Sequence, residues 1–184
     1  MMSPARIDDA GPPRTFGLDY HAARILLLIT AFSDARQPII DGPTKLAKLD
    51  FLLRYPALME RLADVLGYDV PERIRPSPEE RLAVESRMVR YKFGPWDDRY
   101  YPIIGLLLGT GLVQSVSGKG KVALAVTDNG QAIARRVADD EAWRIVADRC
   151  EYLARSFDLS GNRLKDLIYE HLPEVVDRPH RTVI

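Results

Sequence analysis

The sequence predicts a mainly α-helical protein with a small β-sheet, and residues 100–137 carry most of that prediction. The apolar run YYPIIGLLLGTGLVQ predicts a helix that Gly109 and Gly111 end. Two short β-prone runs, 112–116 and 122–126, then flank a turn of serine, glycine and lysine. The next run, TDNGQAIARRVA, opens with a helix-capping signal. The predicted fold is a winged helix-turn-helix with an insertion after the second helix and additional C-terminal helices.

The N-terminal part of the chain is predicted to contain an arm and one helix. Residues 1–17 contain proline, lack apolar periodicity and are expected to form a disordered arm. Asp19 is expected to cap a helix over 21–32. The apolar residues of that helix recur at helical spacing and are Ile25, Leu28, Ile29 and Phe32. Residues 37–40 are expected to be extended because Pro38 prevents helix continuation.

A second helix is predicted over 45–56, after the turn and start signal Asp-Gly-Pro-Thr. Its apolar stripe consists of Leu46, Leu49, Leu52 and Leu53. Lys45 and Lys48 lie off that stripe. Pro56 interrupts the helix and begins a further short helix, which we expect to stop at Gly67.

The segment between the second and third helices of the predicted motif reads as an insertion. Residues 68–80 contain three prolines and are predicted to be a surface loop. Residues 79–93 favour helix in their first half and strand in their second half, and we expect a strand over 86–93. The Gly-Pro-Trp sequence at 94–96 is predicted to turn the chain, and one of the aspartates at 97–98 to begin the apolar helix.

The chain after the predicted wing is expected to add helices at 139–176 to a winged-helix domain at 18–138, before a polar tail at 177–184. The helix that follows the wing is expected to continue or restart near Asp140. A heptad-like seam is formed by Trp143, Val146, Cys150, Leu153 and Phe157. Ser160 is expected to begin the last helix. Its apolar face consists of Leu164, Leu167, Ile168 and Leu172.

Composition favours an intracellular protein that works with partners. The 184 residues carry 26 basic and 26 acidic side chains, so the net charge is zero. A DNA-binding domain that acts alone is usually basic, because neutralising phosphates supplies much of its affinity. The single cysteine, Cys150, excludes an intramolecular disulfide and a cysteine-rich zinc site, and it fits the reducing cytoplasm.

The sequence predicts neither a membrane span nor a signal peptide. The longest uninterrupted apolar run, residues 25–29, is far shorter than the roughly 18 residues that a spanning helix needs. The N-terminal sequence MMSPARIDDAGPPRT lacks an apolar core and carries acidic residues early.

Three basic residues are the candidate nucleic-acid contacts. Lys119 and Lys121 lie between glycines at the predicted wing tip, where flexible backbone and two ammonium groups suit phosphate contact. A solvated hairpin turn would have the same composition. Arg99 lies at the start of the predicted third helix, the element that reads base edges in DNA-binding winged helices. Because the rest of that helix is apolar and two aspartates precede it, a core helix with an aromatic partner-facing end is favoured.

Aromatic residues are the candidate partner contacts. Trp96, Tyr100 and Tyr101 cluster with Tyr91 and Phe93 around the predicted Gly-Pro turn. Trp and Tyr often dominate the energy of protein interfaces, and core packing is the alternative role. Trp143, on the C-terminal seam, is a further candidate.

We expect no enzymatic activity, no metal and no cofactor. The three histidines, His21, His171 and His180, lie far apart without metal-ligand spacing. Adjacent acids at predicted helix starts are explained by the positive end of the helix dipole. The sequence contains no phosphate-binding loop, nucleophile elbow or zinc motif.

Two segments carry a resemblance to known proteins. TKLAKLDFLLRYP and, further on, MVRYKFGPWDDRYYPIIGLLLGTGLV resemble the small winged-helix middle components of bacterial ABC-ATPase three-component defence systems. The K-L-x-K-L-x-F-L and aromatic-Gly-Pro elements are also similar to the Panacea domain of antitoxins. The resemblance covers about residues 40–137. It implies binding to an SMC-like ATPase or an effector, and it transfers no catalytic residue.

The leading hypothesis is a non-catalytic accessory subunit that mediates protein–protein assembly in an antiviral defence complex, with sequence-nonspecific contact to double-stranded DNA. A homodimer is also compatible with the sequence. The alternative is a DNA-binding transcriptional regulator or antitoxin.

Overall fold

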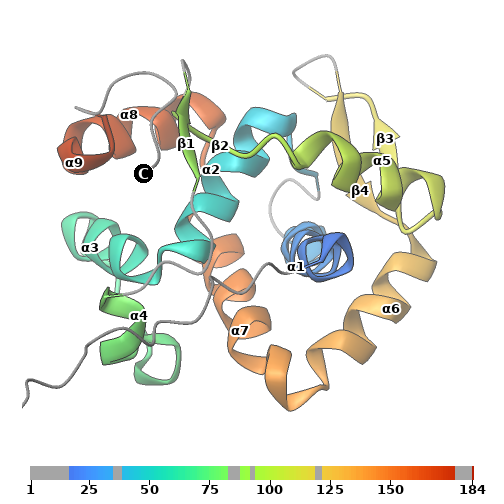
Figure 1. Ribbon diagram of the computed structural model, residues 1–184, viewed down its shortest axis with the longest axis horizontal. Coiled ribbons are helices and arrows are strands. Elements are labelled where there is room, and N and C mark those ends of the chain that lie inside the picture. The colour runs from blue at the N-terminus through green and yellow to red at the C-terminus, as the bar shows by residue number, and fades with distance from the viewer. Residues whose placement is uncertain (1–16, 35–38, 83–87, 92–93, 119–121, 177–183) are drawn as a thin grey trace, which may run out of the picture.

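The computed structural model describes residues 17–34, 39–82, 88–91, 94–118, 122–176 and 184, and they form a mainly helical structure with small antiparallel sheets (Figure 1). The α-helices are α1 (Leu18–Ala31), α2 (Pro43–Arg54), α3 (Pro56–Leu66), α4 (Pro78–Leu82), α5 (Tyr100–Gly109), α6 (Asp128–Ala138), α7 (Glu141–Ser156), α8 (Gly161–His171) and α9 (Pro173–Val176). The strands are β1 (Val89–Tyr91), β2 (Gly94–Trp96), β3 (Val113–Val116) and β4 (Ala123–Val126), and the short 3-10 helices are η1 (Phe32–Asp34) and η2 (Glu72–Ile74).

Helix α1 is the centre of the structure. It packs against α2, α5, α6, α7 and β4, and Figure 1 shows it end-on with these elements around it. Residues 25–29 are each at most 5% exposed, so this helix is apolar on every side along its second half. Gly17, and not Asp19 as expected, is the N-cap residue, and Asp19 lies in the first turn.

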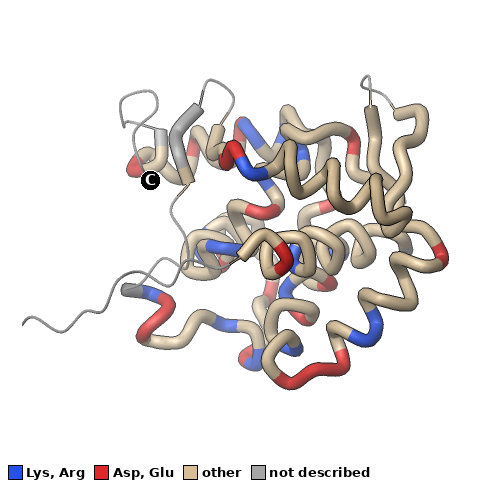
Figure 2. The backbone as a smooth tube through the Cα atoms, turned by 45° about the vertical axis from the view of Figure 1, so that its right-hand side comes forward, with Lys and Arg blue, Asp and Glu red and all other residues tan. Residues whose placement is uncertain are grey.

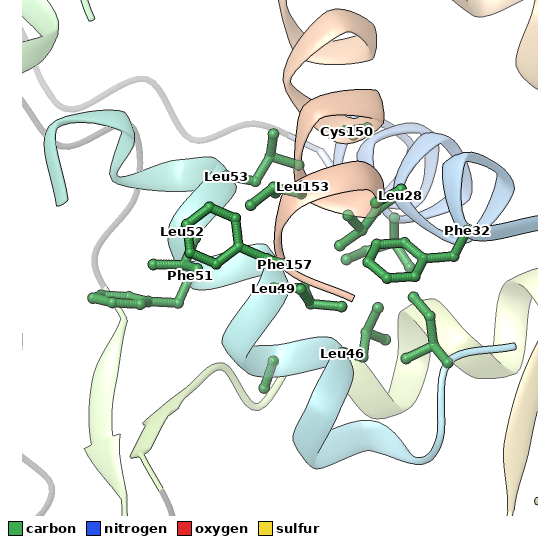
Figure 3. Close-up of a cluster of buried hydrophobic side chains, with 14 of the residues drawn as sticks. Leu28, Phe32, Leu46, Leu49, Phe51, Leu52, Leu53, Cys150, Leu153 and Phe157 are labelled. Atoms are coloured by element: carbon green, nitrogen blue, oxygen red, sulfur yellow. The ribbon is translucent and has the colours of Figure 1, made fainter. Parts of the chain in front are cut away.

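Helix α2 is also buried all round, because α1, α3, α7, α8 and β2 pack against it. Its leucines meet α1 and α7 in the apolar cluster of Figure 3, where Leu49, Phe157 and Phe32 are each 0% exposed. The expectation that Lys45 and Lys48 lie off a one-sided apolar stripe was therefore incomplete. Both lysines are buried, at 3% and 4% exposure.

The two buried lysines differ in their partners. The ammonium of Lys45 lies 3.1 Å from Asp158 Oδ1 and 5.3 Å from the centre of the Phe32 ring. The ammonium of Lys48 donates to the Thr44 carbonyl oxygen at 3.0 Å, and the described residues show it no carboxylate within 4 Å. Burial, followed by the charge of Lys165, lowers the pKa of Lys48 to about 8.

We expect Lys48→Met to stabilise the protein by about 1–2 kcal/mol at pH 7, because it removes a buried charge that has no carboxylate partner among the described residues. The folded pKa of Lys48 lies below its ordinary value of 10.5. The penalty is thus fully present below pH 8 and fades as pH rises from 8 to 10.5. Urea unfolding of both proteins between pH 7 and pH 10.5 measures the effect.

Lys45→Met is the matched control in the same helix. It removes an ammonium that has a carboxylate partner, so we expect it to destabilise the protein. If both substitutions changed the unfolding free energy equally, the buried charge of Lys48 would not be the destabilising feature.

The β3–β4 hairpin matches the predicted wing strands closely. Val113 pairs with Val126, and Val116 pairs with Ala123. Ile40 adds an isolated antiparallel bridge to Leu124, with N–O distances of 2.9 and 3.0 Å in the two directions. The predicted extended segment 37–40 is therefore represented by its last residue, while 35–38 lie outside the described residues.

The structure corrects the sequence prediction between 68 and 100. Residues 68–80 contain η2 and the start of α4, and Val70 and Ile74 are buried rather than on a surface loop. Gly94–Trp96 is strand β2, paired antiparallel with β1, and not a turn. The φ angle of +118° at Gly94 explains why a glycine begins this strand. The apolar helix starts at Tyr100 and not at the preceding aspartates.

The C-terminal helices belong to the same apolar core as α1 and α2. The chain restarts a helix after Asp140, whose carboxylate accepts from the Ala142 amide, and Ser160 caps α8 by accepting from the Arg163 amide. The predicted apolar seam and the predicted face of α8 both pack into this core. Helix α9, with Val175 buried, lies within the segment 139–176 that was predicted to be helical.

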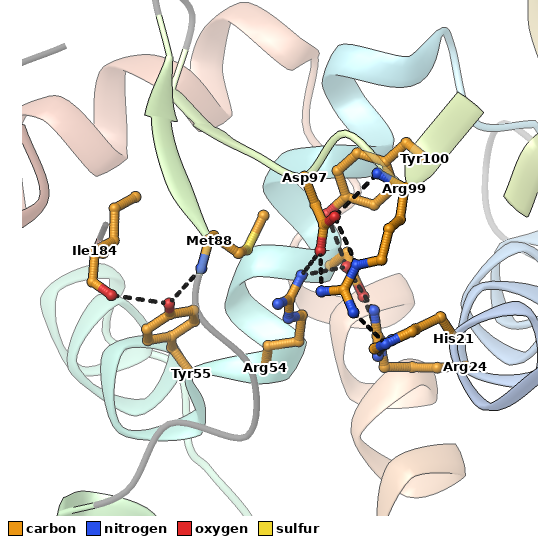
Figure 4. A network of polar contacts seen from close by, with 10 residues as sticks. His21, Arg24, Arg54, Tyr55, Met88, Asp97, Arg99, Tyr100 and Ile184 are labelled. Carbon is orange, nitrogen blue, oxygen red and sulfur yellow. Dashed lines mark hydrogen bonds and ion pairs between the residues drawn. The ribbon is translucent and has the colours of Figure 1, made fainter. Parts of the chain in front are cut away.

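The two ends of the chain are described only in part. Residues 1–16 and 177–183 lie outside the described residues. The predicted N-terminal arm and C-terminal tail therefore stay predictions. Ile184 is described. Its amide donates to the Met88 carbonyl at 2.8 Å. Its carbonyl accepts from the Tyr55 hydroxyl at 3.3 Å (Figure 4). Among the described helices, none is long and apolar enough to cross a membrane.

Candidate partner-binding site

Helix α5 has one buried face and one exposed apolar face. Tyr100, Ile103 and Leu107 point into the core and are at most 2% exposed. The opposite face, which we call the outer face of α5, consists of Tyr101, Pro102, Gly105, Leu108 and Gly109. Tyr101 is 67% exposed and Leu108 37%. No residue from 100 to 110 carries a charged side chain, and Figure 2 shows α5 as an uncharged stretch beside the hairpin.

An aromatic group stands at the first turn of α5. The ring of Trp96 lies 5.3 Å from that of Tyr100 and 5.7 Å from that of Tyr101, centre to centre. Trp96 is partly buried and packs between the core and the ring of Tyr101. Tyr100, expected among the partner-binding residues, is 1% exposed and therefore cannot meet a partner. Its hydroxyl points inward to Asp50.

Asp50 is the shared acceptor of a buried polar network, and Figure 4 labels its partners Arg24, Arg54 and Tyr100. Its carboxylate accepts from Arg24 Nε at 2.7 Å and from Arg24 Nη2 at 3.1 Å, and from the Tyr100 hydroxyl at 2.7 Å. Arg54, one turn later on α2, lies 3.6 Å away. Burial by itself raises the pKa of Asp50, but the charges of Arg24 and Arg54 outweigh it and the pKa is lowered. The network therefore holds an ionised carboxylate that is fully buried.

Asp97 joins this network to the start of α5. It accepts from Arg54 Nη1 at 2.9 Å, from Arg99 Nε at 2.9 Å and from Arg99 Nη2 at 2.6 Å. Burial opposes ionisation, but the hydrogen bonds from Arg99 hold the pKa of Asp97 well below its usual range. Arg99, expected as a nucleic-acid contact, thus has its guanidinium engaged by Asp97 and His21. Its side chain is still 36% exposed, so contact of Arg99 with nucleic acid stays a prediction.

His21 lies between two arginines. Arg24 Nη1 is 2.8 Å from His21 Nδ1, and Arg99 Nη1 is 2.5 Å from His21 Nε2. Burial, then the charges of Arg24 and Arg99, lowers the pKa of His21 to about 4. The imidazole is therefore neutral at pH 7, and a neutral ring accepts through one nitrogen only. The second nitrogen carries a hydrogen that faces an arginine.

We expect His21 to make the protein less stable as pH falls. Its folded pKa of about 4 lies below the ordinary 6.5, so the unfolded chain takes up a proton between those values while the folded chain does not. Lowering pH from 7 to 5 should cost about 1–2 kcal/mol through this group. Urea unfolding at both pH values measures the loss, and His21→Gln should remove that part of it.

His171→Gln is the control, because its imidazole is only partly buried and lies 3.6 Å from exposed Glu170. If His21→Gln retains the full loss between pH 7 and pH 5, the stability change does not come from His21.

The remaining sequence-predicted residues lie apart from this site or outside the description. Trp143 packs on Tyr20 of α1, with ring centres 4.9 Å apart, and is partly exposed. Lys119 and Lys121 lie outside the described residues, so phosphate contact by the wing tip stays a prediction. The described residues contain no group of His, Cys, Asp or Glu that could hold a metal ion. Cys150 is buried, and burial raises the pKa of its thiol far above the usual value.

Sequence reasoning missed two features that have identifiable signals. The first is Asp50, a lone carboxylate between Leu49 and Phe51, where an acid in an apolar run points to a buried partner. The second is the outer face of α5, whose members Tyr101, Gly105 and Leu108 have the spacing of one helix face.

Comparison of the chain with protein-family models, with curated proteins and with solved structures finds no match.

Proposed function

We propose that this chain is a winged-helix subunit that binds another protein through the outer face of α5. The order of its elements supports the winged helix: α1, the bridge at Ile40, α2, α5, the β3–β4 hairpin and α6. The elements between α2 and α5 are then the insertion, and α7 to α9 are the additional helices. In this arrangement α5 occupies the place of the recognition helix.

The observation that carries the proposal is the chemistry of that helix. A helix that reads DNA presents polar and basic side chains to base edges and phosphates. The outer face of α5 instead presents Tyr101, Leu108 and two glycines, with no charge. Exposed apolar residues grouped on one face are typical of protein-binding surfaces. An exposed tyrosine supported by a tryptophan resembles the anchors that dominate such interfaces.

The proposed class of partner rests on the uncharged outer face of α5 and on the resemblance of residues 40–137 to the middle components of ABC-ATPase defence systems. We propose a non-catalytic accessory role in a cytoplasmic bacterial defence assembly, with an SMC-like ATPase or an effector as the partner. The zero net charge and the engaged guanidinium of Arg99 support a protein partner over DNA as the main ligand. Contact with DNA is proposed only for the wing tip, through phosphates.

The test is titration calorimetry of the full chain with a purified SMC-like ATPase and a purified effector, the two proposed partners. We expect Leu108→Arg or Tyr101→Ala to weaken binding by at least about 2 kcal/mol, because both side chains are exposed at the proposed contact. Their melting temperatures should stay near that of the wild type. Val65→Arg, at a 49% exposed position on α3, is the control and should bind normally. Unchanged binding by both α5 variants would refute the proposal.

The alternative function, a DNA-binding regulator or antitoxin, predicts a different result. The isolated chain would then bind one duplex specifically, and removing each phosphate contact would lower the slope of log affinity against log salt by about 0.9. Lys119→Glu/Lys121→Glu would abolish that binding while Leu108→Arg would leave it intact. This outcome would replace the partner-binding proposal.

A further inference from the structure

A second site lies where α1, α6 and α7 border a cavity of about 850 Å³ that is open to solvent. The cavity exists because five alanines line it where these helices meet: Ala31, Ala134, Ala138, Ala147 and Ala154. Its volume lies within the roughly 300–1,000 Å³ of small-molecule sites. The part of α6 that lines it, residues 131–138, is about 12 Å long, which matches a compound of two fused rings.

Two arginines from different helices line this cavity and have weak partners. Arg135 of α6 lies 3.5 Å from the amide oxygen of Gln131, at the limit of a hydrogen bond. Arg155 of α7 lies 3.9 Å from Glu151, and both of these side chains are more than half exposed. Each guanidinium therefore keeps donors for a further acceptor.

The charges at the cavity favour an anion. Glu151 and Asp158 also line it, but Asp158 is neutralised by Lys45 at 3.1 Å. Glu151 is shared loosely with Arg155, which leaves the positive charge of Arg135 without a carboxylate partner among the described residues. Arginines on two helices that face one cavity suit a carboxylate, which accepts from a guanidinium through two oxygens.

We infer that this cavity binds a small organic carboxylate, with its apolar rings over the alanines and its carboxylate held by Arg135 and Arg155. The inference is independent of the outer face of α5, because no residue of α5 lines the cavity.

The test compares 2-naphthoate with its neutral isostere 2-naphthamide, using alanine-methyl NMR of the full chain. We expect naphthoate to shift the methyl signals of Ala134, Ala147 and Ala154 with one-to-one saturation. The amide should bind at least about tenfold more weakly, because it lacks the charge that the arginines recognise. Arg135→Gln and Arg155→Gln should each reduce naphthoate affinity and leave the amide unaffected.

Two further variants make the test decisive. Arg136→Gln, next to Arg135 in sequence but outside the cavity lining, should leave naphthoate binding unchanged. Ala147→Leu should fill the cavity and abolish binding of both compounds while the protein stays folded. Equal affinity for the two compounds, loss of naphthoate binding in Arg136→Gln, or shifts confined to alanines that do not line the cavity would overturn the inference. So would an absence of shifts, or signals that change with protein concentration alone, which would indicate that a second copy fills the cavity.

Discussion

Asp50→Asn is expected to destabilise the protein by about 3–5 kcal/mol, the largest effect of any single substitution considered. The carboxylate is 0% exposed and accepts from Arg24 and Tyr100 while lying 3.6 Å from Arg54. The amide removes the buried negative charge that Arg24 and Arg54 share, although Arg54 keeps its 2.9 Å ion pair with Asp97. Urea unfolding at pH 7 measures the difference in unfolding free energy.

Two controls separate the effect of removing this buried carboxylate from the effect of removing any carboxylate. Asp166→Asn removes an exposed carboxylate on α8 and should change stability by less than about 0.5 kcal/mol. Arg24→Met/Asp50→Leu replaces the 2.7 Å ion pair of Asp50 with apolar groups. Its loss of unfolding free energy should be smaller than the sum of the losses of the two single substitutions. A loss below about 1 kcal/mol for Asp50→Asn would show that water or another group compensates the arginines.

The same network sets an acid limit for the fold. The folded pKa of Asp50 and that of Asp97 are both lowered, so their stabilising contribution is present above the ordinary aspartate value of 3.8. It is lost as pH falls below that value through the folded pKa of each group. Asp50→Asn should therefore show a shallower decline of stability in that acidic range than the wild type.

Gly130→Ala is expected to cost about 3 kcal/mol, the second large effect. Gly130 is buried in the first turn of α6, and a Cβ atom there would overlap the carbonyl oxygen of Leu112 and crowd Val126. Leu112 precedes β3, and its carbonyl also accepts from the amide and hydroxyl of Thr127. The extra methyl group must therefore push α6 away from the hairpin. Thermal and urea unfolding measure the loss.

Gly105→Ala is the matched control, because it also places alanine at a helical glycine. A Cβ atom at Gly105 meets nothing within 4 Å. The substitution should stabilise the protein by about 0.5–1 kcal/mol through its higher helix propensity. If Gly130→Ala were as well tolerated as Gly105→Ala, α6 and the hairpin would not be in the close contact described.

The buried network connects stability to the proposed partner site. Tyr100 and Asp97 stand on either side of Arg99 at the start of α5, and each is bonded to the network. The hydrogen bond from Tyr100 to Asp50 and the one from Arg54 to Asp97 fix the direction in which the first turn of α5 leaves β2. Tyr101, the next residue, is thereby held outward against Trp96. A rigid anchor loses less side-chain entropy when it binds, which favours affinity.

The segment 100–137 could be predicted because its signals are local. Gly111 has a φ of +68°, which glycine adopts without strain, and Thr127 accepts from the Gly130 amide as an N-cap does. The helix, hairpin and helix therefore appear within one to three residues of the predicted bounds. The restart at Asp140 and the cap at Ser160 follow from the same kind of short-range hydrogen bond.

Strand β2 could not be predicted because it has no local signal. Gly94 and Pro95 are unfavourable in strands, and three residues are too few for an alternating pattern. They form a strand since β1 and α2 pack beside them. The same reason explains Val70 and Ile74, which a proline-rich composition placed on the surface and which contacts from distant elements bury.

The sequence by itself determined the helical class, the hairpin with its flanking helices and the capped starts of α6, α7 and α8, because glycine, proline and capping side chains act over a few residues. The tertiary structure alone decided which polar residues are buried and which apolar residues remain exposed. Burial depends on elements that are far apart along the chain, as Arg24, Asp50 and Asp97 are. For that reason the buried network, the outer face of α5 and the alanine-lined cavity emerge only when α1 is surrounded by its neighbours.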